Sequence, residues 1–108
     1  MMVDDFIAQR KKEVENNKII LYIKGTKENP QCGFSDRTIQ IFNQVGKPFA
    51  TVDILANPEI RSRMEEFSHW PTFPQVFIGG QFIGGCDIVT EMYENGELTP
   101  LVEKAFGA

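Results

Sequence analysis

The sequence predicts an α/β fold in which one small mixed sheet carries helices on both faces. Segments with apolar residues at helical spacing alternate along the chain with short, continuous apolar runs. The first two runs flank a helical segment, and such a strand–helix–strand unit implies a parallel pair with a right-handed crossover. Two later runs are joined by Gly79-Gly80, a hairpin signal that adds an antiparallel pair.

The first half of the chain predicts two helices and two strands. A helix is expected over residues 3–16, and residues 18–24 (KIILYIK) are typical of a strand covered on both faces. Residues 36–45 predict a second helix, and residues 49–54 a second strand. The apolar faces of the two helices are expected to carry Phe6, Ile7 and Val14, and Thr38, Ile41, Phe42 and Val45.

The second half begins with a helix start at residues 57–59 (NPE), because Asn caps, Pro suits the first turn and Glu favours the positive helix end. Residues 75–78 and 81–83 form the hairpin strands, and Asp87 is expected to cap the next helix. The resulting order, α-β-α-β-α-β-β-α-α, is thioredoxin-like. The last three helices carry Ile60, Met64 and Phe67; Ile88, Met92 and Tyr93; and Leu98, Leu101, Val102 and Phe106.

Composition narrows the classes of function. With 108 residues, the chain is expected to form a single domain over residues 1–108. A net charge of −4 is a poor match for nucleic acid or an anionic membrane. Residues 19–23, the longest apolar run, fall far short of the ~20 that span a bilayer, and residues 1–5 hold no apolar signal core. A cytoplasmic location is therefore expected.

Cys32 and Cys86 would normally be reduced in such a compartment. Together with His69, the single histidine, they cannot close a four-ligand zinc site within one chain. A metal held by this protein would need ligands from elsewhere.

Cys32 lies between the loop 25–31 and the helix that follows. Unpaired N–H groups and the positive dipole at a helix N-terminus favour the thiolate, which is the nucleophile and the metal ligand. Lys24 could add positive charge nearby. The alternative, a buried and inert cysteine, does not explain the glycine, proline and polar residues around it.

Residues 32–35 (CGFS) occupy the place of a C-x-x-C redox motif, with serine in place of the last cysteine. A dithiol motif releases a mixed disulfide by internal attack, and this motif cannot do so locally. Turnover of protein disulfides is therefore expected to be slow unless another thiol resolves the intermediate.

Two further motifs are candidates for a binding site. In residues 70–75 (WPTFPQ), Pro74 directly precedes a strand, where neighbouring amides tend to stay free and the X-Pro bond is a candidate for the cis form. In residues 84–87 (GGCD), glycines allow close approach of a ligand, and the amides of the next helix suit a carboxylate. The alternatives are a rigid loop with a packed Trp and a simple helix cap. Thioredoxin-like topology would bring both motifs and Cys32 to one edge.

Lys24-Gly25, residues 30–35, residues 70–75 and residues 84–88 together resemble the CGFS-type monothiol glutaredoxins. The similarity runs over nearly the whole chain, in the family's order and spacing, and the length is similar to the bacterial single-domain form. The resemblance implies a role in the storage, assembly and transfer of iron–sulfur clusters, with BolA-like proteins and apo iron–sulfur proteins as partners.

The resemblance also implies roles for site residues. Cys32 matches the active thiol and cluster ligand, and Lys24 and Arg61 match residues that pair with the glycine carboxylate of glutathione. Phe73 and the cis-proline Pro74 match the residues beside its cysteinyl part. Cys86 and Asp87 match the pair that holds its γ-glutamyl end.

Counting ligands leads to a similar hypothesis. A [2Fe–2S] cluster takes four thiolates, and Cys32 from each of two chains plus two glutathiones would supply them across a homodimer. An alternative set is Cys32 and Cys86 from both chains. A second class of function is a glutathione-dependent thiol–disulfide oxidoreductase acting on glutathione mixed disulfides, with Cys86 as a resolving thiol. A third is an adaptor that docks a partner without using Cys32.

Overall fold

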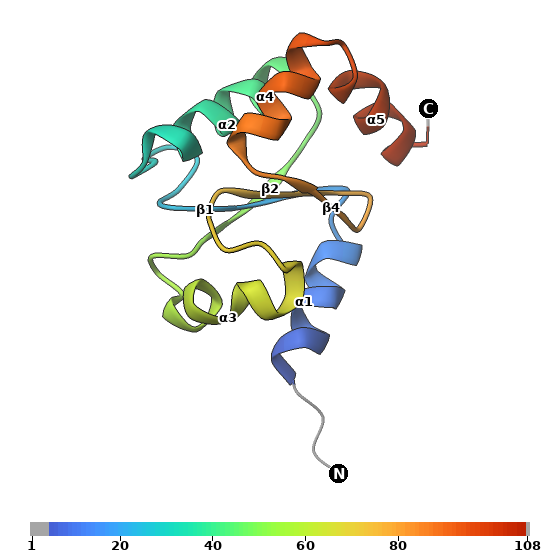
Figure 1. Cartoon of the computed structure of the whole chain (residues 1–108). Helices are drawn as coiled ribbons and strands as arrows, with labels where there is room; N and C mark the ends of the chain where they lie inside the picture. The colour runs from blue at the N-terminus through green and yellow to red at the C-terminus, as the bar shows by residue number, and fades with distance from the viewer. Residues whose placement is uncertain (1–4, 108) are drawn as a thin grey trace.

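The computed structural model describes residues 5–107, so residues 3 and 4 of the first expected helix lie outside it. In this part of the chain, helices and strands follow the predicted order, and most bounds agree within one or two residues (Figure 1). The elements are α1 Asp5–Glu15, β1 Ile19–Ile23, α2 Gly33–Val45, β2 Ala50–Asp53, α3 Pro58–Ser68, β3 Gln75–Ile78, β4 Gln81–Gly84, α4 Cys86–Glu94 and α5 Leu98–Ala105.

A four-stranded mixed sheet in the order β2-β1-β3-β4 forms the centre of the structure. Strand β1 runs parallel to β2, with Ile20 opposite Ala50. Strand β3 runs antiparallel to both β1 and β4, and Gly79 and Gly80, both at positive φ, turn the β3–β4 hairpin. The predicted thioredoxin-like fold is therefore confirmed.

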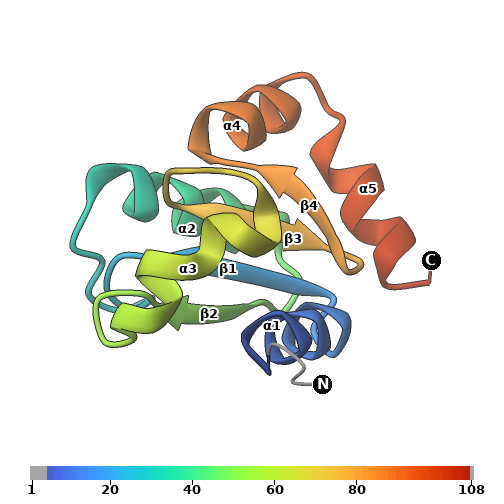
Figure 2. The ribbon, with the colours of Figure 1, turned by 60° about the horizontal axis from the view of Figure 1, so that its bottom comes forward.

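Helices cover both faces of this sheet. Figures 1 and 2 show α2, α4 and α5 on one face and α1 and α3 on the other. Alternate residues of β1 serve the two cores, because successive side chains of a strand point to opposite faces. Ile19, Leu21 and Ile23 pack in the first core, and Ile20 and Tyr22 in the second. This double burial explains the continuous apolar run.

Helix α2 begins at Gly33, three residues before its predicted start at Asp36. The first turn carries no apolar periodicity, so its helical state is set by contacts rather than by pattern. The Lys24 N–H donates to the fully buried Ser35 hydroxyl at 3.1 Å, and the Asp36 N–H donates to the Cys32 carbonyl at 2.9 Å. The earlier start puts Cys32 itself at the N-cap position.

Two predicted helix caps differ in the structure. Helix α4 begins at Cys86 with Gly85 as its N-cap, so the prediction that Asp87 caps it is wrong. The chain enters the helix directly after the glycines of β4, which leaves Asp87 in the first turn. Asn57 stands at the N-cap of α3 as predicted, but its side chain donates to the Asp53 carbonyl at 2.8 Å instead of capping.

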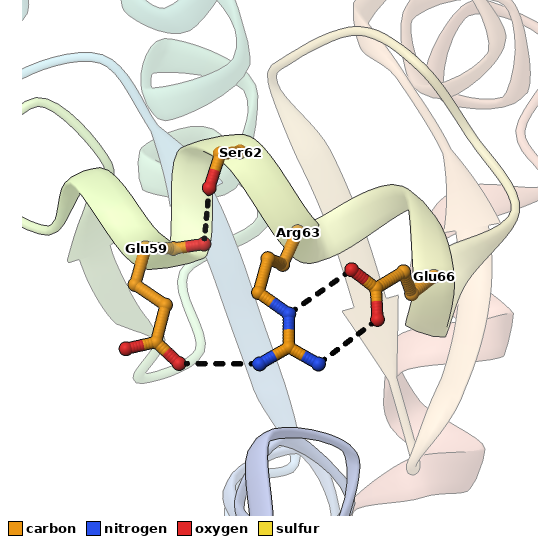
Figure 3. Close-up of polar contacts among 4 residues, drawn as sticks. All are labelled: Glu59, Ser62, Arg63 and Glu66. Atoms are coloured by element: carbon orange, nitrogen blue, oxygen red, sulfur yellow. Dashed lines mark hydrogen bonds and ion pairs between the residues drawn. The ribbon is translucent and has the colours of Figure 1, made fainter. Parts of the chain in front are cut away.

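An arginine ties α3 to α1. The Arg63 guanidinium donates to both carboxylate oxygens of Glu66 at 3.0 Å and lies 3.5 Å from Glu59 (Figure 3). It also stacks over Phe6 of α1, 4.6 Å from the ring centroid. The two ion pairs lie within α3, and the contact with the Phe6 ring joins α3 to α1. Within residues 5–107, no helix is long and apolar enough to cross a membrane.

Candidate functional site

A groove of about 700 Å³ lies at the end of the sheet where β1 ends and β3 begins. Five segments that are far apart in the sequence contribute to its lining. The structure thus brings the three motifs together, as the topology predicts. The lining includes all seven candidate residues: Lys24, Cys32, Arg61, Phe73, Pro74, Cys86 and Asp87.

Cys32 is half-buried at the N-terminus of α2, with an extended backbone (φ −153°, ψ 136°). The backbone N–H of Ser35 is the largest influence on its thiol and lowers the pKa. Partial burial opposes this effect, while the Phe34 N–H and the Lys24 ammonium lower the pKa further. The net direction is downward, so the groove contains a thiol that favours its ionised, nucleophilic form.

Lys24 is held at the groove by the tight loop that follows β1. Gly25 adopts φ +97° and donates its N–H to the Asp53 carboxylate at 3.0 Å. A Cβ on Gly25 would lie 2.6 Å from the Asn29 carbonyl oxygen, so only glycine fits without a shift of the loop. The Gln31 N–H closes the loop by donating to the Lys24 carbonyl at 2.8 Å.

Arg61, which lines the groove, and Arg63, which lies between α3 and α1, differ in their contacts. Arg61 and Arg63 are two positions apart on α3 and therefore do not share a face. Arg63 is engaged with two glutamates, whereas Arg61 is exposed at the groove. Within residues 5–107, the side chains of Lys24, Arg61 and Asp87 form no hydrogen bond or ion pair.

Residues 70–74 form one wall of the groove. The predicted cis peptide bond is confirmed between Phe73 and Pro74. The Trp70 ring packs on Phe82 with 5.6 Å between centroids, so the packed Trp of the alternative interpretation is present as well. A Cβ on Gly85 would lie 3.3 Å from the Pro74 carbonyl oxygen, which shows how closely the facing segment approaches this wall.

Residues 85–88 form the facing wall. Gly84 has φ +152°, and a Cβ there would lie 2.9 Å from Ile88. Cys86 lines the groove but is only 6% exposed, with its sulfur 3.8 Å from the Thr90 hydroxyl. Asp87 is exposed. Within residues 5–107, no group of three or more His, Cys, Asp and Glu side chains is placed to hold a metal ion.

Two apolar groove residues were not predicted as part of the site. Phe34 is 61% exposed and Ile88 is 38% exposed, and both line the groove. Ile88 belongs to the expected apolar face of its helix, yet the buried residue there is Val89. The sequence offered one signal for both residues, because each lies two positions after a cysteine of a candidate motif.

Comparison with known proteins gives consistent matches. Residues 19–83 match the family model described as Glutaredoxin. The chain is 50% identical over 95 residues to a Synechocystis sp. protein named "Uncharacterized monothiol glutaredoxin ycf64-like", covering 88% of this chain and 89% of that one.

Two solved structures extend these matches. The solution structure of reduced poplar apo GrxS14 has 47% identity and a TM-score of 0.83, covering 95% of this chain and 94% of that chain. The crystal structure of a buckwheat glutaredoxin–glutathione complex has 27% identity and a TM-score of 0.80, covering 92% and 88%.

Proposed function

The chain belongs to the glutaredoxin family, in its monothiol group, and we propose that it is a CGFS-type member that binds glutathione and carries a [2Fe–2S] cluster. The single observation that carries the proposal is the placement of Cys32. Its thiol has a lowered pKa, is accessible, and lies on a groove large enough for a tripeptide.

The charges of the groove match those of glutathione. Lys24 and Arg61 supply cations for its glycine carboxylate, and Asp87 supplies an anion for its γ-glutamyl amino group. The backbone of Phe73, next to Pro74, is placed on the groove to pair with the cysteinyl part. The relative solved with bound glutathione has the same fold, which supports this assignment.

The cluster would be the cargo of this protein rather than a resident cofactor. Each chain offers Cys32 as one poised thiolate, and a [2Fe–2S] cluster takes four. Two chains and two groove-bound glutathiones complete the set in a homodimer. Because half of these ligands are small and diffusible, the cluster should be labile, which suits storage and transfer.

The likeness to this family supports further parts of the proposal. Apo iron–sulfur proteins would be the recipients, and a BolA-like protein would be a partner. The protein would act in the cytoplasm, with no nucleic acid or membrane involved.

Anaerobic purification with glutathione tests the ligand set. We expect visible cluster absorbance and about two iron, two sulfide and two glutathione per two chains. Cys86→Ser should retain this absorbance, since Cys86 is assigned to the glutathione site rather than to the cluster. Loss of the absorbance in Cys86→Ser, with glutathione present, would overturn the assignment in favour of four protein thiolates.

One observation favours a second candidate function, because Cys86 lines the same groove as Cys32. In a glutathione-dependent oxidoreductase, the Cys32 thiolate would attack the glutathione sulfur of a mixed disulfide and release the substrate thiolate. A second glutathione thiolate would then attack the glutathione sulfur of the new disulfide, forming glutathione disulfide and releasing the Cys32 thiolate. Attack by Cys86 on the Cys32 sulfur would instead release glutathione and leave a Cys32–Cys86 disulfide, which two further glutathiones would reduce. Substantial turnover by protein that binds no iron would favour this function.

A further inference from the structure

Gln75 is an unusual residue for its position. It is the first residue of β3, directly after Pro74, and it is 0% exposed. A buried side-chain amide lowers stability unless it is hydrogen-bonded, so an apolar residue would serve a core position better. The polar side chain therefore calls for an explanation in terms of what it binds.

Its amide is used by the groove wall. Gln75 Nε2 donates to the Trp70 carbonyl at 2.9 Å and to the Thr72 carbonyl at 3.0 Å, which uses both amide hydrogens. Phe77, two residues further along β3, packs in the core shared with α1 and α3. Residues two apart on a strand share a face. The Gln75 side chain therefore lies on the face of the sheet that α3 covers, under the loop 70–74 that follows α3.

This loop has few other polar anchors. Pro71 and Pro74 have no backbone N–H, and within residues 5–107 the segment 70–74 makes no backbone-to-backbone hydrogen bond. The Ser68 hydroxyl accepts from the Trp70 N–H at 3.2 Å, which anchors only the start of the loop. Pro71 and Thr72 are exposed, so their side chains do not hold the loop from inside.

We propose that Gln75 is a positioning residue that fixes the conformation of the loop 70–74 and thereby sets the affinity of the groove for glutathione. The proposal rests on the proposed function. The loop carries the Phe73 backbone and Pro74, and its Trp70 indole nitrogen lies 3.5 Å from where a Cβ on Gly85 would stand. A loop released from Gln75 would therefore alter both walls of the groove.

The test compares Gln75→Met with Tyr22→Phe. Methionine keeps most of the volume and removes both donated bonds. Tyr22 is a matched control, because it lies opposite Gln75 in the β1–β3 register, is 0% exposed, and donates its hydroxyl to Glu13 of α1 instead of the loop. Titration calorimetry with reduced, cluster-free protein gives the glutathione affinity, and urea unfolding gives the stability of each variant.

We expect Gln75→Met to bind glutathione about tenfold more weakly than the unmodified protein, from the loss of two ordering hydrogen bonds. Tyr22→Phe should bind within about twofold of it. Unchanged affinity in Gln75→Met would overturn the inference, and so would an equal loss in Tyr22→Phe, which would indicate general destabilisation.

Two further results keep the test decisive. Absence of glutathione binding in the unmodified protein would overturn the proposed function itself, and with it this inference. If Gln75→Met does not fold, Gln75→Asn takes its place, since the shorter amide stays polar but cannot reach both carbonyls. Full affinity in that variant would overturn the positioning role.

Discussion

Two hollows of the structure differ in how their charges are used. A smaller hollow of about 310 Å³ lies between α1 and the start of α3 and includes Arg10 and Glu59 in its lining. Arg10 Nε lies 3.2 Å from the Glu13 carboxylate, and Glu59 lies 3.5 Å from Arg63. Its charged groups thus have partners within the chain.

The larger groove, beside Cys32, keeps Lys24, Arg61 and Asp87 without such partners among residues 5–107. A charge that is already paired must give up its partner before it binds a ligand, whereas an unpaired charge need only lose water. The charges of the small hollow are thus engaged in ion pairs within their own helices, α1 and α3. Those of the groove remain available to a ligand that carries both signs.

The largest expected effect comes from removing the Cys32 thiolate, which lines the groove and has no counterpart in the smaller hollow. Cys32→Ser should abolish the visible absorbance of cluster-loaded protein, because no other residue offers an accessible thiol at this position. Absorbance spectra and iron counts on anaerobically prepared protein measure the effect. Cluster retained at the normal level in Cys32→Ser would show that Cys32 is not a cluster ligand.

A second change tests whether the loop 25–31, which holds Lys24 at the groove, needs glycine at position 25. Gly25→Ala should lower the free energy of unfolding by about 2–4 kcal/mol, because φ is +97° and the new Cβ meets backbone atoms at 2.6 and 2.7 Å. Gly96 is the control, since φ is +76° with nothing within 4 Å. Gly96→Ala should cost only about 1 kcal/mol. Equal losses of unfolding free energy in the two variants, measured by urea denaturation, would mean that the loop 25–31 shifts readily to accommodate the new Cβ.

The two arginines of α3 sharpen the comparison directly. Arg61→Ala should weaken glutathione binding about tenfold with little change in stability, because it removes an unpaired cation of the groove. Arg63→Ala should lower stability by about 0.5–1 kcal/mol and leave binding unchanged, since its contacts lie within the chain. Calorimetry and denaturation on both variants measure this, and the reverse pattern would contradict the assignment of charges.

The smallest effect concerns pH. The lowered pKa of Cys32, caused first by the Ser35 N–H, predicts a midpoint for its alkylation by iodoacetamide below the ordinary value of about 8.5. Because the folded pKa is below the unfolded one, ionised Cys32 stabilises the fold above the unfolded pKa. This contribution is lost as pH falls through the folded pKa.

Lys24→Gln should raise the midpoint of Cys32 alkylation slightly, because it removes a positive charge that favours the thiolate. A wild-type midpoint at or above that of free cysteine would contradict the role given to the Ser35 N–H.

Elements with strong local patterns were predictable from the sequence. The apolar run of β1 reflects burial on both faces, and Gly79-Gly80 marked the hairpin because both residues adopt positive φ. The start of α2 was predicted three residues late, since its first turn is held by contacts with the Lys24 backbone and not by an apolar pattern. The role of Asp87 as a cap was wrong for a similar reason, because the helix start is set by the glycines before it.

The sequence by itself determined the order of elements, the two cores and the three motifs, since spacing and residue type act locally. Only the tertiary structure decided which charges pair and which stay free. Arg61 and Arg63 are chemically identical and nearly adjacent in the chain, yet α3 turns one toward the groove and the other toward α1. That division depends on which helix packs against which, a long-range property that no local pattern carries.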